Sequence, residues 1–274
     1  MSYATQLLHL DGQARLSTQV DIAARLARRF EGHVIGLSAT GRVPLQAGAG
    51  GGLGFVMAEL RRAAEDRALR FTVEARQQGI SSVEVIVDDD DDALSLATHA
   101  RCCDLVILGQ PEPGQPDSAA ARSLLERTLL GAAPPCLVIP YAGQFKTLGT
   151  QVLVAWNDSV PCTRAIIAAL PFLRQATSVR LMQCDAPSSQ GGAALHPRLA
   201  AATAWLARQG VTAQASVEAT EIDVGNALLS RCSDLGVDLL VAGAWSHSRL
   251  GERLFGGVTR TLLDSMTVPV LMSH

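Results

Sequence analysis

The sequence predicts an α/β protein built from two tandem, doubly wound domains. Its 274 residues exceed the usual length of one domain, and short apolar runs alternate with amphipathic helical patterns along both halves. The run from Asp104 to Gly109 is closely repeated from Asp238 to Gly243, 134 positions later. Pro135 and Pro269 open a further pair of matching runs at the same offset. Such alternation is typical of parallel βαβ units with helices on both faces of the sheet.

Five strands and four helices are expected in each half, because apolar runs of four to eight residues indicate buried strands and longer runs with an apolar stripe indicate helices. In the first half, strands are expected at 5–10, 33–39, 82–87, 104–109 and 136–140, with helices at 15–30, 56–78, 92–102 and 119–131. In the second half, strands are expected at 151–156, 178–184, 212–218, 238–243 and 269–273, with helices at 161–173, 194–209, 223–235 and 257–266. We therefore predict domains at 1–142 and 150–274.

Two local patterns within the first half are interpreted as structural. The acidic run from Asp88 to Asp92 stands before an expected helix, and aspartates stabilise a helix start by capping its free amides. The glycine-rich run 41–54 contains neither the dinucleotide-binding glycine pattern nor the Gly-Lys-Ser/Thr ending of a phosphate loop. We interpret it as a linker, with a lid over the domain as the alternative.

Several classes of function have no support in the composition. A net charge of -3 gives no basic surface for nucleic acid, and no apolar run approaches the roughly 18 residues that span a membrane. The first residues lack a targeting pattern, so a cytoplasmic location is expected. The six cysteines and six histidines show no metal-ligand spacing, and no nucleophile stands in a known catalytic motif. We predict no metal site and no catalytic residue.

The stretch 238–269 combines an apolar strand, a polar loop and a glycine step into a helix. Gly256 and Gly257 precede an apolar stripe that begins at Val258. The first amides of a helix have no partner within the helix, and glycines let an anion approach them. This stretch therefore predicts an anion site.

At this stretch the sequence resembles the universal stress protein family, whose nucleotide-binding members carry Gly-x2-Gly-x9-Gly-Ser/Thr. Gly243 and Gly256 match the first and third glycines, while Ser246 and Gly257 stand at the second and fourth positions. The resemblance implies the strand order 3-2-1-4-5 and a crevice beyond the first and fourth strands, where ligands of such sheets collect. An aspartate commonly follows the first strand in the family, and Asn157 stands there in the second half.

The resemblance implies that the second half binds ATP or a related adenine nucleotide, with Mg²⁺ only alongside the nucleotide. The expected binding residues follow the first strand, the fourth strand and the glycine step of that half: Asn157, Asp158, Ser159, Gly243, Ser246, His247, Arg249, Gly256, Gly257, Val258 and Thr259. Trp156 is expected to wall the crevice, and Arg253 and Arg260 to surround the phosphate. A structural alternative explains Asp158 and Ser159 as a helix cap followed by Pro161 in the first turn.

The first half departs from this pattern at the equivalent positions. Glu112, Arg122 and Ser123 stand where the second half has Ser246, Gly256 and Gly257, and the intervening loop is rich in proline. A carboxylate and prolines without amide hydrogens do not suit a phosphate. We therefore expect the first half to be a structural copy whose ligand site has degenerated.

The leading functional hypothesis is a tandem universal stress protein, a stress-response binding or regulatory protein. One alternative is an interaction scaffold that binds no nucleotide, and a second is a slow ATP hydrolase on the same site. The apolar terminal strands 136–139 and 269–272 would expose unpaired edges, so a homodimer is also expected.

Overall fold

A computed structural model describes residues 2–12, 15–41, 53–185, 196–244 and 257–274. The chain forms two compact units, Ser2–Cys136 and Leu137–His274. The division falls inside the strand β5 (Cys136–Ile139), a few residues before the linker expected at 143–149. No helix in the described residues is long and apolar enough to cross a bilayer.

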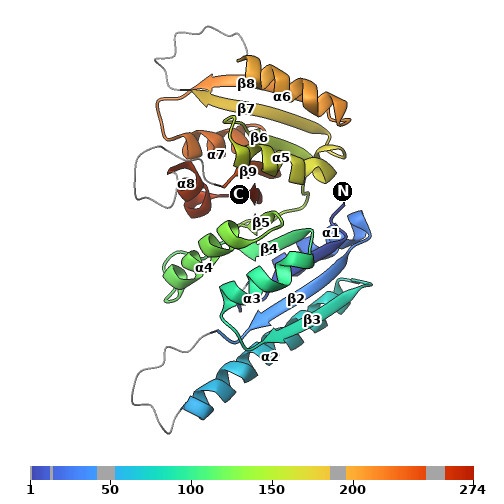
Figure 1. Ribbon diagram of the computed structural model, residues 1–274, viewed down its shortest axis with the longest axis vertical. Coiled ribbons are helices and arrows are strands. Elements are labelled where there is room, and N and C mark those ends of the chain that lie inside the picture. The colour runs from blue at the N-terminus through green and yellow to red at the C-terminus, as the bar shows by residue number, and fades with distance from the viewer. Residues whose placement is uncertain (1, 13–14, 42–52, 186–195, 245–256) are drawn as a thin grey trace. The chain divides into compact units, whose positions relative to one another are not determined.

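The first half follows the predicted order of elements. They are β1 (Thr5–His9), α1 (Leu16–Phe30), β2 (His33–Ala39), α2 (Leu53–Gln77), β3 (Val83–Asp88), α3 (Asp92–His99), a 3₁₀ turn (Ala100–Cys102), β4 (Leu105–Gly109), α4 (Ser118–Gly131) and β5. The strand order is β3-β2-β1-β4-β5, and β1 pairs in parallel with both β2 and β4. Helix α1 packs on α2, and α3 packs on α4 (Figure 1).

The second half repeats this arrangement. Its elements are β6 (Gln151–Ala155), α5 (Val160–Leu173), β7 (Ser178–Asp185), α6 (Pro197–Arg208), β8 (Ala213–Ala219), α7 (Val224–Asp234), β9 (Leu239–Gly243), α8 (Gly257–Ser265) and β10 (Val270–Ser273). The strand order is β8-β7-β6-β9-β10, with β6 parallel to both β7 and β9. The expected order 3-2-1-4-5 is therefore confirmed in both halves, as is the α/β class.

The repeated aspartates, Asp104 and Asp238, have the same structural role in each half. Asp104, before β4, accepts a hydrogen bond of 2.8 Å from the amide of Thr5 at the start of β1. Asp238, before β9, accepts hydrogen bonds from the amides of Thr150 and Gln151 at 2.8 and 2.9 Å. Each carboxylate thus fixes the start of the central strand next to it, which explains the repeat in physical terms.

The acidic run forms the expected helix start. The carboxylate of Asp91 accepts hydrogen bonds from the amides of Ala93 and Leu94, both at 3.2 Å, and caps α3. The helix expected at 92–102 is shorter than predicted, because its last three residues, Ala100–Cys102, form a 3₁₀ turn. Such turns are frequent where an α-helix ends.

Candidate functional site

The carboxyl ends of β6 and β9 lie side by side in the second half. Val154 of β6 is in register with Val241 of β9, so the segments that follow both strands leave the sheet at the same edge. Asn157, Asp158 and Ser159 follow β6, Gly243 ends β9, and α8 begins with Gly257, Val258 and Thr259. The predicted site residues Ser246, His247, Arg249 and Gly256 lie outside the described residues, as does Arg253.

The side chain of Asn157 folds back on the following turn. Its Oδ1 atom accepts a hydrogen bond from the hydroxyl of Ser159 at 2.7 Å and one from the Ser159 amide at 3.3 Å. Because the main-chain amide of Ser159 can only donate a hydrogen bond, its partner on Asn157 is assigned as the side-chain oxygen. The Nδ2 group of Asn157 therefore points away from this turn. Asn157 is exposed and therefore offers a donor to solvent, whereas an aspartate would offer a second acceptor.

Ser159 is the N-cap of α5, as the structural alternative predicts. Its hydroxyl oxygen accepts a hydrogen bond of 3.2 Å from the amide of Cys162, and a proline stands in the first turn. The capping interaction and the contact with Asn157 use the Ser159 hydroxyl, so this side chain is committed to the fold.

Asp158 has a partner that sequence reasoning missed. Its backbone adopts the left-handed conformation, with a φ of 54°, and its carboxylate accepts two hydrogen bonds from Arg198 at 2.9 and 3.0 Å. Arg198 lies in the first turn of α6, so the pair joins the loop after β6 to that helix. Hydrogen bonding to the Arg198 guanidinium holds the pKa of Asp158 below its usual value of 3.8.

We expect Asp158→Asn to lower the stability of the second unit slightly at neutral pH. The depressed pKa means that the stabilisation is present above the usual carboxyl pKa of 3.8 and is lost as the pH falls through the folded value. Asparagine tolerates the left-handed backbone, so the substitution isolates the charge pair from strain. Urea unfolding of the original protein and of Asp158→Asn at pH 7 and pH 3 measures the effect. If the two proteins differed in free energy of unfolding by the same amount at both pH values, the prediction would be contradicted.

Gly243 is required by packing. A Cβ atom built on it would lie 2.5 Å from the Cys162 nitrogen and 2.8 Å from the carbonyl carbon of Pro161. The first turn of α5 therefore rests directly on the backbone at the end of β9. The first glycine of the motif has a structural reason that is independent of any ligand.

Among the described residues, none covers the amino end of α8. Gly257 is exposed, and a Cβ atom built on it would meet no atom of the described residues within 4 Å. Val258 is partly exposed, but Thr259 is only 4% exposed and its side chain faces the protein interior. Thr259 can thus contribute its main-chain amide to a ligand, while its hydroxyl points away from solvent.

Trp156 is a core residue, and little of its side chain is accessible to a ligand in the crevice. It is 8% exposed, and its indole nitrogen is buried without a hydrogen-bond partner among the described residues. Arg260 is paired with Asp264 at 3.7 Å along the exposed side of α8. These two side chains are therefore less suited to a ligand than the sequence suggested.

In the first half, the glycine equivalent to Gly243 is packed just as closely, but against side chains. Gly109, which ends β4, is covered by the amide of Gln19, and a Cβ atom at Gly109 would lie 2.8 Å from Asp11 Oδ2. Gln19 is 2% exposed. Arg122 lies within α4 and pairs with Glu126 at 2.6 Å, so the helix end is not open at that position. The absence of an anion site from this half remains a prediction.

Sequence reasoning missed Gln19, Arg67 and Arg198. Arg67, from α2, donates hydrogen bonds to the Ser38 hydroxyl at 3.1 Å and to the Ala39 carbonyl at 2.6 Å. Its half-buried position lowers its pKa, chiefly by desolvation. Each of these side chains belongs to a helix that was expected only from its apolar stripe. An apolar stripe does not indicate which polar side chains of the helix reach the ends of the strands.

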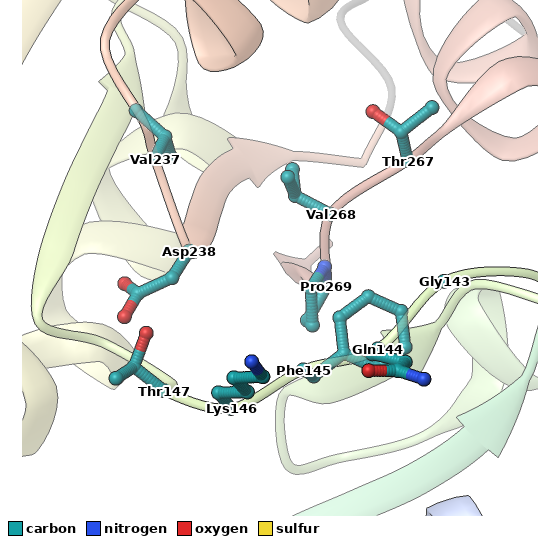
Figure 2. A pocket seen from close by; sticks show the side chains of 10 residues that line it. All are labelled: Gly143, Gln144, Phe145, Lys146, Thr147, Val237, Asp238, Thr267, Val268 and Pro269. Carbon is teal, nitrogen blue, oxygen red and sulfur yellow. The ribbon is translucent and has the colours of Figure 1, made fainter.

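A small hollow lies at the opposite, amino ends of β9 and β10 (Figure 2). It is lined by the linker 143–147 and by the residues that precede the two strands, Val237, Asp238 and Thr267 to Pro269. The Asp238 carboxylate faces the linker there and is already bonded to two main-chain amides. This hollow is therefore separate from the predicted crevice and has a structural explanation.

The fold and the crevice define a class of doubly wound, parallel α/β proteins in which ligands collect beyond the first and fourth strands. Residues 150–274 match the model of the universal stress protein family. The second half of the chain is therefore similar to this family.

Three proteins illustrate what the whole chain is similar to. The chain is 29% identical over 210 residues to the universal stress protein Slr1230 of Synechocystis sp. PCC 6803, covering 72% of this chain and 67% of the relative. A universal stress protein structure from Archaeoglobus fulgidus matches 99% of this chain and 98% of its own, with 14% identity and a TM-score of 0.76. A protein of unknown function from Pseudomonas aeruginosa PAO1 matches with 16% identity, 98% and 92% coverage and a TM-score of 0.63. At these identities the two solved structures support the fold alone.

Proposed function

We propose that this chain acts as a universal stress protein and binds an adenine nucleotide, such as ATP, in the crevice beyond β6 and β9 of its second half. The observation that carries the proposal is the open amino end of α8, where Gly257 is exposed and no atom of the described residues stands within 4 Å of its Cβ position. In the first half, Arg122 and Ser123 stand at the positions equivalent to Gly256 and Gly257, and Arg122 pairs with Glu126 at 2.6 Å. We therefore propose nucleotide binding for the second half alone.

The phosphate is placed at the first turn of α8. The amides of Gly257, Val258 and Thr259 belong to the turn whose donors have no partner within the helix, and the helix dipole adds positive potential there. His247 and Arg249 precede this turn in the sequence, and we expect them to add positive charge. Mg²⁺ would enter only with the nucleotide, because the described residues contain no cluster of three potential metal ligands.

The nucleoside is placed beside the turn after β6. Asn157 directs its Nδ2 donor outward, since its oxygen is bonded to Ser159. Ribose hydroxyls bind best to an acceptor such as a carboxylate, so Asn157 favours an acceptor on the ligand instead. We infer that phosphate contacts contribute more to affinity here than ribose contacts do.

Calorimetric titration of the full chain with ATP, AMP, adenosine and inorganic triphosphate tests the proposal. Binding of ATP and triphosphate, with much weaker binding of adenosine, is expected from a site dominated by phosphate contacts. A parallel assay for released phosphate separates binding from hydrolysis, and we expect no steady release. Failure of every nucleotide to bind would favour the interaction scaffold.

We expect Asn157→Asp to raise the affinity for adenosine nucleotides by about threefold to tenfold, because a neutral-to-charged change strengthens a hydrogen bond by roughly 1 kcal/mol. One carboxylate oxygen would keep the contacts with Ser159, while the other would accept from the ribose. The affinity for inorganic triphosphate should not rise, since it has no ribose and meets an added negative charge. Equal changes for ATP and triphosphate would contradict the placement of the ribose.

A further inference from the structure

Arg198, in the first turn of α6, has an exposed side chain whose guanidinium is nevertheless held in place. Its Nε atom donates hydrogen bonds of 2.9 and 3.1 Å to the Asp158 carboxylate, and its Nη2 atom donates one of 3.0 Å. These bonds join one edge of the guanidinium to both carboxylate oxygens, the paired geometry that arginine favours. The Arg198 side chain remains 66% exposed. Because the bonds use only an edge of the group, its flat faces are left for other contacts.

The guanidinium lies beside the turn at which the nucleoside is placed. Asp158 directly follows Asn157 in the turn after β6, so the bonds to its carboxylate hold Arg198 one residue away from Asn157. Strand β7 pairs in parallel with β6, and the chain therefore leaves both strands at the same edge of the sheet. Helix α6 follows β7 along the chain. The turn after β6 and the first turn of α6 thus meet at the carboxyl edge of the sheet, where the crevice lies.

Among the described residues that follow β6 and β9, Arg198 offers a flat group that is both exposed and fixed. Trp156 is 8% exposed, Ser159 caps α5, and the backbone at Gly243 is packed against the first turn of α5. Nucleic-acid bases stack on guanidinium planes as well as on aromatic rings, and the positive charge adds a cation–π attraction. A guanidinium that a carboxylate already orients loses little further freedom when a base packs on it.

We propose that Arg198 is a base-stacking residue of the nucleotide site, with its guanidinium plane packed against the purine ring. This inference rests on the proposed nucleotide function and names the side chain that recognises the base. The hydrogen bonds to Asp158 hold the plane beside the turn after β6. A purine has two fused rings and a pyrimidine has one, so the contact favours ATP over UTP.

Calorimetric titration of the full chain with ATP, UTP and inorganic triphosphate tests the proposal. In Arg198→Ala, we expect the dissociation constant for ATP to rise about threefold to tenfold, as the loss of a stacked cation predicts. The constant for UTP should rise less, and the constant for triphosphate should stay the same, because triphosphate has no base. Titration at about 0.15 M salt screens the long-range effect of removing one exposed charge. Arg198→Lys keeps the charge but has no plane, so it should bind ATP as weakly as the alanine variant does.

Arg174→Ala is the matched control. Arg174 is also exposed and donates two hydrogen bonds to one partner, Gln209, but it lies at the carboxyl end of α5, away from the crevice. Its removal should leave ATP affinity unchanged, and urea unfolding compares the stability of the two alanine variants.

Three results would overturn the stacking role while nucleotide binding stands: an unchanged ATP affinity in Arg198→Ala, equal losses for ATP and triphosphate, or full recovery of affinity in Arg198→Lys. Full recovery would mean that the charge alone suffices. An original protein that binds none of the three ligands would instead refute the proposed function, and the stacking role with it.

Discussion

Replacing Gly243 by valine is expected to destabilise the second unit by about 3 kcal/mol or more, because overpacking against rigid backbone has no low-energy escape. A Cβ atom at this position would lie 2.5 Å from the Cys162 nitrogen and 2.9 Å from its Cα atom. Both are main-chain atoms of α5, so a change of side-chain rotamer cannot relieve the contact. Helix α5 would have to move away from β9, on which it packs.

Gly257→Ala is the matched control. It adds the same Cβ atom to another glycine of the motif, but at a position where the described residues leave open space. Alanine is also the better helix former, by up to about 1 kcal/mol within a helix, so stability should stay equal or rise. Urea unfolding of both variants decides the matter, and a valine variant at position 243 that unfolds like the original protein would refute the packing role.

These two glycines illustrate what the sequence can and cannot predict. Spacing from Gly243 located the end of β9 and the start of α8, and both elements occur where they were expected. Spacing alone assigned the same binding role to both residues. The structure separates them, because the close approach of α5 to Gly243 depends on a helix that is distant in the sequence.

The repeat predicted the fold well because its residues act locally on neighbouring strands. Asp104 and Asp238 each fix the start of a central strand, so the matched runs mark equivalent places in two similar sheets. The ion pair of Asp158 with Arg198 spans 40 positions, and the cover of Gly109 by Gln19 joins separate elements. Such contacts depend on which way each helix turns its polar side chains, and apolar periodicity does not determine that.

The apolar residues of α2 illustrate a related limit of sequence-based prediction. The helix was expected from apolar positions in general, and these include both the buried Phe71 and the exposed Leu69. Only the packing of α2 on the sheet separates the inner positions from the outer ones. A hydrophobic residue in a helix therefore predicts the helix more securely than it predicts the partner that the residue contacts.

Substitution of Gly257 should change nucleotide affinity in either direction, according to the side chain introduced. Gly257→Ser places a hydroxyl at the position where the family pattern has Ser or Thr, and it is expected to raise the affinity for ATP about tenfold through a charge-assisted hydrogen bond to phosphate. Gly257→Glu places a carboxylate at the proposed phosphate position and should lower the affinity by about tenfold or more. Among the described residues, no atom lies within 4 Å of the Cβ position at which either side chain would begin.

Stability separates the effect on binding from an effect on folding. An acidic side chain at a helix amino end interacts favourably with the helix dipole, by about 0.3 to 1 kcal/mol. Gly257→Glu should therefore bind ATP more weakly while unfolding at an equal or higher urea concentration, a combination that general damage to the fold does not produce. Ser123→Glu makes a similar change at the equivalent position of the first half, on the exposed side of α4, and should leave ATP affinity unchanged. Equal losses of affinity from the glutamates at 123 and 257 would place the nucleotide elsewhere, whereas a loss confined to position 257 would assign phosphate binding to the amino end of α8.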